Sequence, residues 1–263
     1  MKKIFIAISV AAFFTACTTN AVTGRKQLSL IPEAQLQADA LQQYRGFLSQ
    51  NRVASTSNNR DAEMVKRVGS RIANAITSYY SKQGKGDILS GYEWEFNLVD
   101  GKDVNAWCMP GGKVVVYSGL LPITQNEAAL AVVLGHEITH AVAQHSNEMI
   151  SKQYVSQTVG GVLGAAAKSN IFNQVYGLGS GVYGLRNSRN AEYEADHFGL
   201  LFTAMAGYNP QEAIPFWNRM SAASEGNSKP PEFLSTHPAD GNRIARLQGH
   251  MKEALSYYRP VKR

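Results

Sequence analysis

The stretch that most constrains the fold of this chain is Gly135–His145, which reads GHEITHAVAQH. It contains the pattern H-E-x-x-H, formed by His136, Glu137 and His140. Residues four apart on an α-helix lie on the same face, so both imidazoles of a helical segment can reach one metal ion. Glu137 can then lean toward a water molecule at that metal as a general base. The spacing therefore predicts a metal-binding helix.

The flanking residues also favour a helix across this pattern. A capping box is read at Thr124–Glu127, and the apolar run Ala128–Leu134 follows it and continues through Ala143. No proline occurs between Ile123 and Gly160. A buried helix is not expected to carry two histidines and a glutamate unless a metal ion balances them. The alternative is a chance match, which a single motif does not exclude.

A second segment, Glu192–Asp196, argues against chance. Glu192 and Asp196 are four residues apart and share one helical face, whereas Glu194 points roughly the other way. A zinc site built on two histidines needs a third protein ligand, and a further carboxylate orients a histidine ring. Glu192 suits the first task and Asp196 the second. The alternative is a solvated acidic face of a surface helix.

Two motifs, HEITH at 136–140 and SRNAEYEAD at 188–196, together resemble the gluzincin metallopeptidases of the HtpX and CAAX-prenyl-protease family, above all their lipoprotein and OMA-type members. Four further stretches match that family: TGRKQLSLIPE, DVNAWCMPGGKVVVYSGLL, AGYNPQEAIPFWNRM and STHPADGNRIARL. The resemblance therefore runs from about Thr23 to about Leu247. It implies a zinc peptidase with one Zn²⁺ per chain, bound by His136, His140 and Glu192.

The same resemblance implies where a substrate binds. In the family, the edge strand of a small sheet lies beside the metal helix, and a substrate chain adds to it as a further strand. Asn105 and Ala106 match the position of that strand. Strand addition uses backbone hydrogen bonds and so tolerates many substrate sequences. On the residues alone, Asn105 is equally well explained as a strand-end residue that caps a turn.

The late stretch His237–Arg243 looks like the family's H-P-x-x-x-x-R segment, whose histidine and arginine face the metal cleft. Pro238 fits the first turn of a helix, so we expect His237 before the helix and Arg243 on its second turn. His237 could stabilise the oxyanion of the transition state, or occupy the open zinc position and hold the enzyme latent. A helix-capping histidine without a catalytic part is the third reading.

Two other histidines are expected away from the metal. His145 follows His140 by five residues, which on one helix places it on the opposite side from the ligands, as a structural or exposed residue. His197 directly follows Asp196 and is similarly off the ligand face.

The start of the chain resembles a lipoprotein signal peptide. After the basic Met1–Lys3, the apolar stretch Ile4–Phe14 has the length of a signal-peptide core and is too short to span a bilayer. Ala16 before Cys17 resembles a lipobox, although Phe14 departs from the usual aliphatic residue. We therefore expect removal of residues 1–16 and lipidation of Cys17, which anchors the protein to a membrane. An ordinary signal peptide with an incidental cysteine is the alternative.

Composition favours one domain behind a short tether. We expect residues 17–30 to be the tether and residues 31–263 to be a single peptidase domain, because no linker or repeat interrupts them. Cys108 has no expected partner and lies in an apolar run, as a buried residue. The formal net charge is +6, but lysines and arginines are scattered, which favours a solvated surface over nucleic-acid binding. No other segment has the length and apolar character of a full membrane span.

The order of expected elements gives an α+β class. Helices are expected at Ala34–Ser49, Asp61–Tyr80, the metal helix, Glu192–Ala206, Gln211–Ala223 and Pro238–Glu253. Strands are expected at Tyr92–Leu98 and in a hairpin of Val104–Met109 with Lys113–Tyr117. The glycine-rich stretch 160–184 reads as close-packed helices or as a loop. With the resemblance, this predicts a predominantly helical zincin-like domain with a small antiparallel sheet whose edge strand lies beside the metal helix.

The sequence thus predicts a zinc endopeptidase that is lipid-anchored in a bacterial cell envelope, at the outer membrane facing the periplasm, and cleaves misfolded envelope proteins. The second hypothesis is a chaperone-like envelope assembly factor that binds unfolded chains and seldom cleaves them. A comparison of turnover between the wild type and Glu137→Gln separates the two hypotheses.

Overall fold

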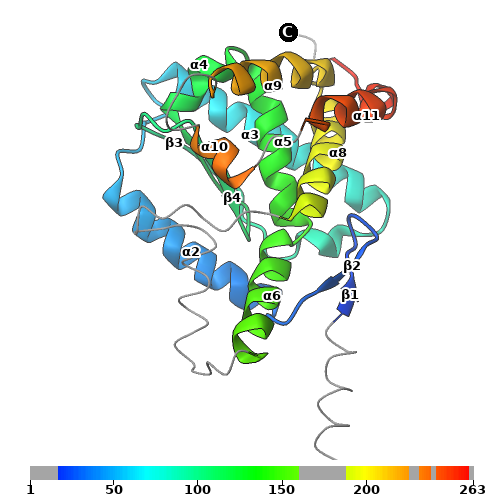
Figure 1. Ribbon diagram of the computed structural model, residues 1–263. Helices are drawn as coiled ribbons and strands as arrows, with labels where there is room; N and C mark the ends of the chain where they lie inside the picture. Colours follow the sequence, from blue (N-terminus) through cyan, green and yellow to red (C-terminus); the bar gives the residue numbers. More distant parts are fainter. Residues whose placement is uncertain (1–16, 160–187, 225–230, 238–240, 261–263) are drawn as a thin grey trace, which may run out of the picture.

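The computed structural model describes residues 17–159, 188–224, 231–237 and 241–260. The expected signal peptide, the glycine-rich stretch 160–184 and Pro238 lie outside these ranges. Within them, helices predominate and surround one central helix, α5 (Glu127–Val142), as Figure 1 shows. None of the described helices combines the length and the apolar character needed to cross a bilayer.

Helix α5 is buried along almost its whole length. Every residue from Ala129 to Val142 is buried, so this part of the helix has no solvent face, and its sequence is apolar except for the metal motif and Thr139. Asn126 caps its start, where the side-chain oxygen accepts a hydrogen bond from the backbone N–H of Ala129 at 2.9 Å. The cap expected at Thr124 is therefore wrong, because that residue ends the short helix α4 (Leu121–Thr124).

The metal helix ends earlier than expected, at Val142. Gln144 adopts a left-handed conformation with φ 53°, which turns the chain before helix α6 (His145–Val159) begins. His145 is thus the first residue of a new helix and not a continuation of α5. Its expected place on the far side of the metal helix is wrong for this reason.

Helix α8 (Arg189–Met205) packs along α5 and brings the two metal motifs together (Figure 1). Ser188 caps its start by accepting a hydrogen bond from the backbone N–H of Ala191 at 3.2 Å. Gly135 of α5 faces Gly199 of α8 where the helices approach. Close to that point, the Thr203 hydroxyl donates to the Ala131 carbonyl at 3.1 Å and links the two helices.

The three-stranded sheet is mixed, and this corrects the expected antiparallel sheet. Strands β4 (Ala106–Met109) and β5 (Lys113–Tyr117) form the expected antiparallel hairpin. Strand β3 (Glu95–Val99) pairs with β5 in parallel, and the order is β3-β5-β4. The reason is that β5 enters between the two earlier strands and does not add outside β4. Strand β4 is left at the edge and contacts α5, as expected.

Apolar side chains cover both faces of this sheet. One face carries Phe96, Leu98, Val114 and Val116 and belongs to the main core, which includes α5 and helix α3 (Arg60–Lys82). The buried stripe of α3 follows the expected helical period: Val65, Val68, Ile72 and Ile76. The other face carries Val99, Met109 and Val115 and packs with Leu36 and Tyr44 of helix α2 (Glu33–Gln50) and with Ile150 of α6.

The segment expected as a tether, residues 17–30, is folded against the domain. Strands β1 (Cys17–Thr19) and β2 (Lys26–Leu28) pair antiparallel beside α6 (Figure 1). The turn between them is fixed by Asn20, whose side-chain amide donates to the Ala143 carbonyl at 2.6 Å. This hydrogen bond joins the segment to the end of the metal helix.

The remaining described elements include three 3-10 turns and three helices. These are the 3-10 turns η1 (Gly86–Leu89), η2 (Ser118–Leu120) and η3 (Pro210–Glu212) and the helices α9 (Ala213–Ala222), α10 (Glu232–Thr236) and α11 (Arg243–Tyr257). Asn209 caps η3 by accepting from the backbone N–H of Gln211 at 3.1 Å. Arg243 is the first residue of α11, so its expected place on a second helical turn is wrong.

Candidate metal centre

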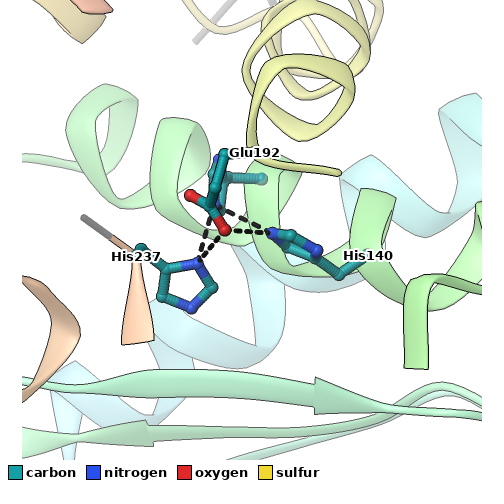
Figure 2. A group of neighbouring side chains, drawn as sticks. His140, Glu192 and His237 are labelled. Atoms are coloured by element: carbon teal, nitrogen blue, oxygen red, sulfur yellow. Dashed lines mark hydrogen bonds and ion pairs between the residues drawn. The ribbon is translucent and has the colours of Figure 1, made fainter. Parts of the chain in front are cut away.

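Four buried side chains from three parts of the chain converge on one point. His136 and His140 come from α5, Glu192 from the first turn of α8 and His237 from the residue after α10. Figure 2 shows how Glu192 reaches toward His140 and His237. The Nε2 atom of His136 lies 3.1 Å from Nε2 of His140 and 3.2 Å from Nδ1 of His237. Oxygens of Glu192 lie 3.0 Å from His237 Nδ1 and 3.4 Å from His140 Nε2.

This donor set fits one zinc ion. Ligand atoms about 2.0–2.1 Å from a tetrahedral zinc stand about 3.3 Å apart, close to the distances between these four groups. Imidazole nitrogen and carboxylate oxygen are ordinary zinc ligands. The three expected ligands, His136, His140 and Glu192, are therefore brought together, and His237 contributes a fourth donor.

Asp196 and Arg243 hold the ligands from behind. Asp196 Oδ1 lies 3.1 Å from His136 Nδ1, the ring nitrogen that faces away from the donor group. Arg243 donates through Nε to Asp196 Oδ2 at 2.7 Å and through Nη2 to Glu192 Oε2 at 2.6 Å. Its guanidinium carbon lies 3.9 Å from the centre of the Trp217 ring. One buried cation thus orients Glu192 and Asp196 of α8.

The local charges favour a cation at this point. Burial lowers the pKa of His136, but hydrogen bonds to Asp196 and Glu192 outweigh burial and raise it to about 9. Burial alone would raise the pKa of Glu192, yet the charge of His237 and the hydrogen bonds of His136 and His140 hold it well below its ordinary value. Burial lowers the pKa of His140 well below its ordinary value, so this ring is neutral and can bind a metal.

Glu137 lies next to the donor group but outside it. Its Oε1 atom is buried and accepts no hydrogen bond within the described part of the chain, and His237 Nε2 is 3.4 Å away. Burial raises the pKa of Glu137, and the charges of His237 and His136 partly offset that rise. A buried carboxylate oxygen without a donor is costly unless a ligand or water molecule uses it. Glu137 is therefore placed to accept a proton beside the metal.

His145 is a part of the site that the sequence reasoning missed. It is buried, its Nδ1 lies 2.9 Å from Nδ1 of His140, and its Nε2 lies 3.0 Å from Glu194 Oε2. Glu194 does point away from the donor group, as expected, but toward His145 and Arg25. Nothing in the sequence marks the break at Gln144, since neither glycine nor proline stands there.

His197 lies away from the metal group, as expected. Its Nε2 lies 2.7 Å from Glu253 Oε2, and its ring stacks on that of His250 with centroids 3.9 Å apart. All three residues are at least partly exposed, between α8 and α11. This cluster has no contact with the cleft histidines among the interactions of the described residues.

Asn105 and Ala106 lie at the start of the edge strand. The Asn105 side-chain oxygen accepts a hydrogen bond from the Ala106 backbone N–H at 2.9 Å. Next to them, the Phe233 N–H of α10 donates to the Val104 carbonyl at 3.0 Å. The segment that carries His237 is therefore bonded to the chain at the entrance of β4.

Comparison with known proteins gives the same family as the two motifs. The sequence model of Peptidase family M48 matches residues 59–251. Mitochondrial metalloendopeptidase OMA1 of Saccharomyces cerevisiae is 34% identical over 187 residues, 69% of this chain and 54% of that protein. Metalloendopeptidase OMA1, mitochondrial, of Bos taurus is 28% identical over 283 residues, 96% of this chain and 50% of that protein.

A bacterial relative matches a smaller part of this chain. The beta-barrel assembly-enhancing protease of Yersinia pestis is 32% identical over 163 residues, 58% of this chain and 33% of that protein. The chain thus spans about half or less of the length of these relatives. Since the family match covers both metal motifs and most of the sequence, the expected family is confirmed and the chain belongs to peptidase family M48.

Proposed function

We propose that this protein is a zinc endopeptidase that cleaves polypeptide chains. The observation that carries the proposal is the position of Glu137: a buried carboxylate whose Oε1 accepts no hydrogen bond within the described residues, beside four convergent metal donors. Relatives named as metalloendopeptidases support the same activity. In this proposal His136, His140 and Glu192 hold one zinc ion, and Asp196 orients His136.

A bound zinc ion would supply Lewis acidity, which activates water and polarises the scissile carbonyl. Glu137 accepts the proton of the attacking water, because burial raises its pKa toward that of a useful base. The protonated Glu137 then gives this proton to the leaving amine, so that the carboxylate is regenerated. Asp196 and Arg243 keep the ring of His136 and the carboxylate of Glu192 in place throughout.

The substrate is proposed to bind as an added strand along β4. This strand is at the edge of the sheet and contacts α5, so a chain paired with it runs past the metal donors. Ala106 begins the strand, Asn105 directly precedes it, and both are proposed to contact the substrate backbone. Because backbone groups make the pairing, the site suits unfolded chains of varied sequence.

His237 is proposed to hold the site latent. Its Nδ1 lies among the donor atoms, while its Nε2 lies 3.4 Å from Glu137 Oε1. In this position the His237 ring occupies both the fourth ligand position and the space beside the general base, Glu137. Substrate must displace it, after which the same histidine is close enough to donate to an oxyanion. Arg243 anchors the segment, since its Nη1 donates to the His237 carbonyl at 3.4 Å.

The location proposed for the protein is a bacterial envelope, with a lipid on Cys17 and misfolded envelope proteins as substrates. The support is the lipobox-like sequence and the exposure of Cys17 at the start of β1. The outer membrane, facing the periplasm, is the proposed site of the anchor.

An assembly factor is the second candidate function. It is favoured by the position of His237, which closes the metal site, and by the printed name of the Yersinia pestis relative, an assembly-enhancing protease. Such a factor would bind unfolded chains along β4 with little turnover.

Cleavage of unfolded casein by a soluble form that begins after Cys17 distinguishes the two functions. We expect cleavage that a chelator stops and added zinc restores. Glu137→Gln should retain zinc and lose activity by a factor on the order of 10²–10⁴, since a general base contributes about that much. Zinc-loaded wild type that binds casein without cleaving it would support the assembly factor, and an active Glu137→Gln variant would contradict the mechanism.

A further inference from the structure

We propose that Arg25, Glu194 and His145 form a chain of positioning residues that orients the metal ligand His140, so that the N-terminal turn is a working part of the metal site. Of these four residues, only His140 belongs to the donor group. The inference rests on the zinc site of the proposed function, and it does not depend on whether the protein cleaves its substrate.

The first step is the direction of the His140 ring. Its Nε2 lies 3.1 Å from His136 Nε2 and 3.4 Å from Glu192 Oε1, so this nitrogen faces the metal donors. A neutral imidazole that binds a metal through Nε2 carries its proton on Nδ1. The Nδ1–H of His140 points to His145 Nδ1 at 2.9 Å and needs an acceptor there.

The second step fixes the tautomer of His145. Since His145 Nδ1 must accept a hydrogen bond, its ring proton is on Nε2. That nitrogen lies 3.0 Å from Glu194 Oε2, and a carboxylate can only accept. Each of these hydrogen bonds therefore has one donor and one acceptor, and the ring protons of His140 and His145 each have one defined position. This arrangement extends the usual pairing of a metal-bound histidine with a carboxylate by one ring.

The two ligand histidines are thus supported from opposite faces of α8. His136 is bonded directly to Asp196, at 3.1 Å. His140 has no carboxylate on its Nδ1 and reaches Glu194 through His145. Glu194 stands between Glu192 and Asp196 in sequence and points the other way, so one turn of α8 supplies a ligand and the supports of both histidines.

The last step is the cation that holds Glu194. Arg25 donates through Nε to Glu194 Oε1 at 2.6 Å and through Nη2 to Glu194 Oε2 at 3.1 Å. The same guanidinium binds Glu148 of α6, with Nη2 to Oε2 at 2.6 Å and Nη1 to Oε1 at 2.9 Å. Hydrogen bonds of this kind between a guanidinium and a carboxylate fix geometry as well as charge.

The turn that carries Arg25 is itself bonded to the break between α5 and α6. Asn20 donates through its backbone N–H to the Arg25 carbonyl at 2.8 Å and through its side chain to the Ala143 carbonyl at 2.6 Å. Ala143 precedes the left-handed Gln144 and then His145. The N-terminal turn therefore holds both the backbone that presents His145 and the carboxylate that orients its ring.

Zinc affinity, measured by competition with a chromogenic chelator, tests this chain directly. We expect Glu194→Gln and His145→Phe each to weaken zinc binding about 10- to 100-fold, the usual effect of losing such a partner. Arg25→Met should weaken it in the same direction. The double variant that combines Glu194→Gln with His145→Phe should bind zinc about as weakly as the weaker of these two single variants, because the two residues act in series.

Arg67→Met is the matched control. Arg67 also makes a 2.6 Å ion pair with a glutamate, Glu127, but at the opposite end of α5 from His140. We expect its zinc affinity to match that of the wild type. If Glu194→Gln, with its fold verified by circular dichroism, binds zinc as tightly as Arg67→Met, the proposal is overturned.

A measurement on the zinc-loaded wild type needs no variant. Nitrogen-15 NMR of the histidine rings reports which nitrogen carries each proton. We expect the proton on Nδ1 in His140 and on Nε2 in His145. The opposite tautomer at His145 would also overturn the proposal, whereas zinc binding without any casein cleavage would count against the proposed activity alone.

Discussion

Gly135 of α5 and Gly199 of α8 lie back to back, with no room for a side chain between the helices. A Cβ atom on Gly199 would come 2.7 Å from the backbone nitrogen of His136, and one on Gly135 would come 2.6 Å from the Gly199 carbonyl oxygen. Both obstacles are backbone atoms, which cannot rotate away. This contact sets the distance between the helix with His136 and the helix with Glu192.

Gly199→Ala should therefore push the two metal motifs apart. We expect a lower free energy of unfolding, by about 1–3 kcal/mol as for other overpacked cores, and weaker zinc binding. Gly249→Ala is the control, because Gly249 lies exposed in α11 with nothing within 4 Å of its Cβ position. That change should stabilise the helix by about 0.5–1 kcal/mol. Urea unfolding and zinc titration measure both effects, and equal zinc affinity in the two variants contradicts the prediction.

Glu192→Ala should remove most of the bound zinc. The change deletes a ligand and also removes one of the carboxylates to which Arg243 donates. Glu194→Ala keeps all the donors, so it should still carry close to one zinc per chain at saturating metal, though with lower affinity. Elemental analysis of the purified proteins checks this difference, and equal metal content in the two variants would refute the choice of Glu192 as ligand.

His237→Ala should raise the basal cleavage of an unfolded substrate. The ring lies among the donors and beside Glu137, so its removal opens the place that water and substrate need. Zinc should remain bound, because His136, His140 and Glu192 suffice for a catalytic site. His197→Ala is a suitable control, since that histidine contacts Glu253 outside the cleft. A lower kcat with normal zinc content would show that His237 stabilises the oxyanion instead.

The stability of the metal-free protein should depend on Glu194 in a defined pH range. Burial raises the pKa of Glu194, but hydrogen bonds from His145 and Arg25 outweigh burial and lower it from 4.5 to about 2. A folded-state pKa below the unfolded value means that ionisation favours the folded state. The stabilisation is therefore complete above about pH 4.5 and is lost as the pH falls toward 2.

Glu194→Gln should accordingly unfold at lower urea concentration than the wild type near neutral pH. The difference should shrink as the pH falls below 4.5, because the wild-type carboxylate becomes protonated. Chelator is present throughout, so that metal release does not contribute. A difference that stays constant down to about pH 2 would show that Glu194 does not stabilise the fold through its charge.

Cys17→Ser should release the protein from the membrane fraction of a bacterial host or leave its precursor unprocessed. A lipidated cysteine anchors a protein through the burial of its acyl chains, each CH₂ contributing about 0.8 kcal/mol. Thr18→Ser, at the exposed neighbouring position, should remain with the membrane. Membrane fractionation and mass spectrometry of the mature N-terminus test this prediction. An unmodified mature N-terminus at another residue would rule out lipidation.

The parts of the site that follow from helical spacing could be predicted from the sequence. His136 and His140 share a face, as do Glu192 and Asp196, and both pairs lie on helices as the four-residue spacing predicts. Local spacing does not reveal how separate segments meet. The convergence of those segments on one point depends on tertiary contacts such as the meeting of Gly135 and Gly199.

The features that could not be predicted depend on single backbone angles and on strand order. Gln144 takes a left-handed conformation that its residue type does not demand, and this alone turns His145 toward His140. Strand β5 inserts between β3 and β4, although hairpin patterns cannot tell an inserted strand from an added one. Likewise, Asn126 and Thr124 are both good caps, and only the turn at Gln125 selects Asn126.

The bridge from Arg243 to Glu192 and Asp196 also orders events during synthesis. Ribosomes make α5 and α8 before Arg243, which pairs with Glu192 and Asp196 of α8. Until Arg243 emerges, a collapsed intermediate would bury these acids without their guanidinium partner, at a cost of several kcal/mol. A nascent chain that stops short of α11 therefore gains little from closing the cleft.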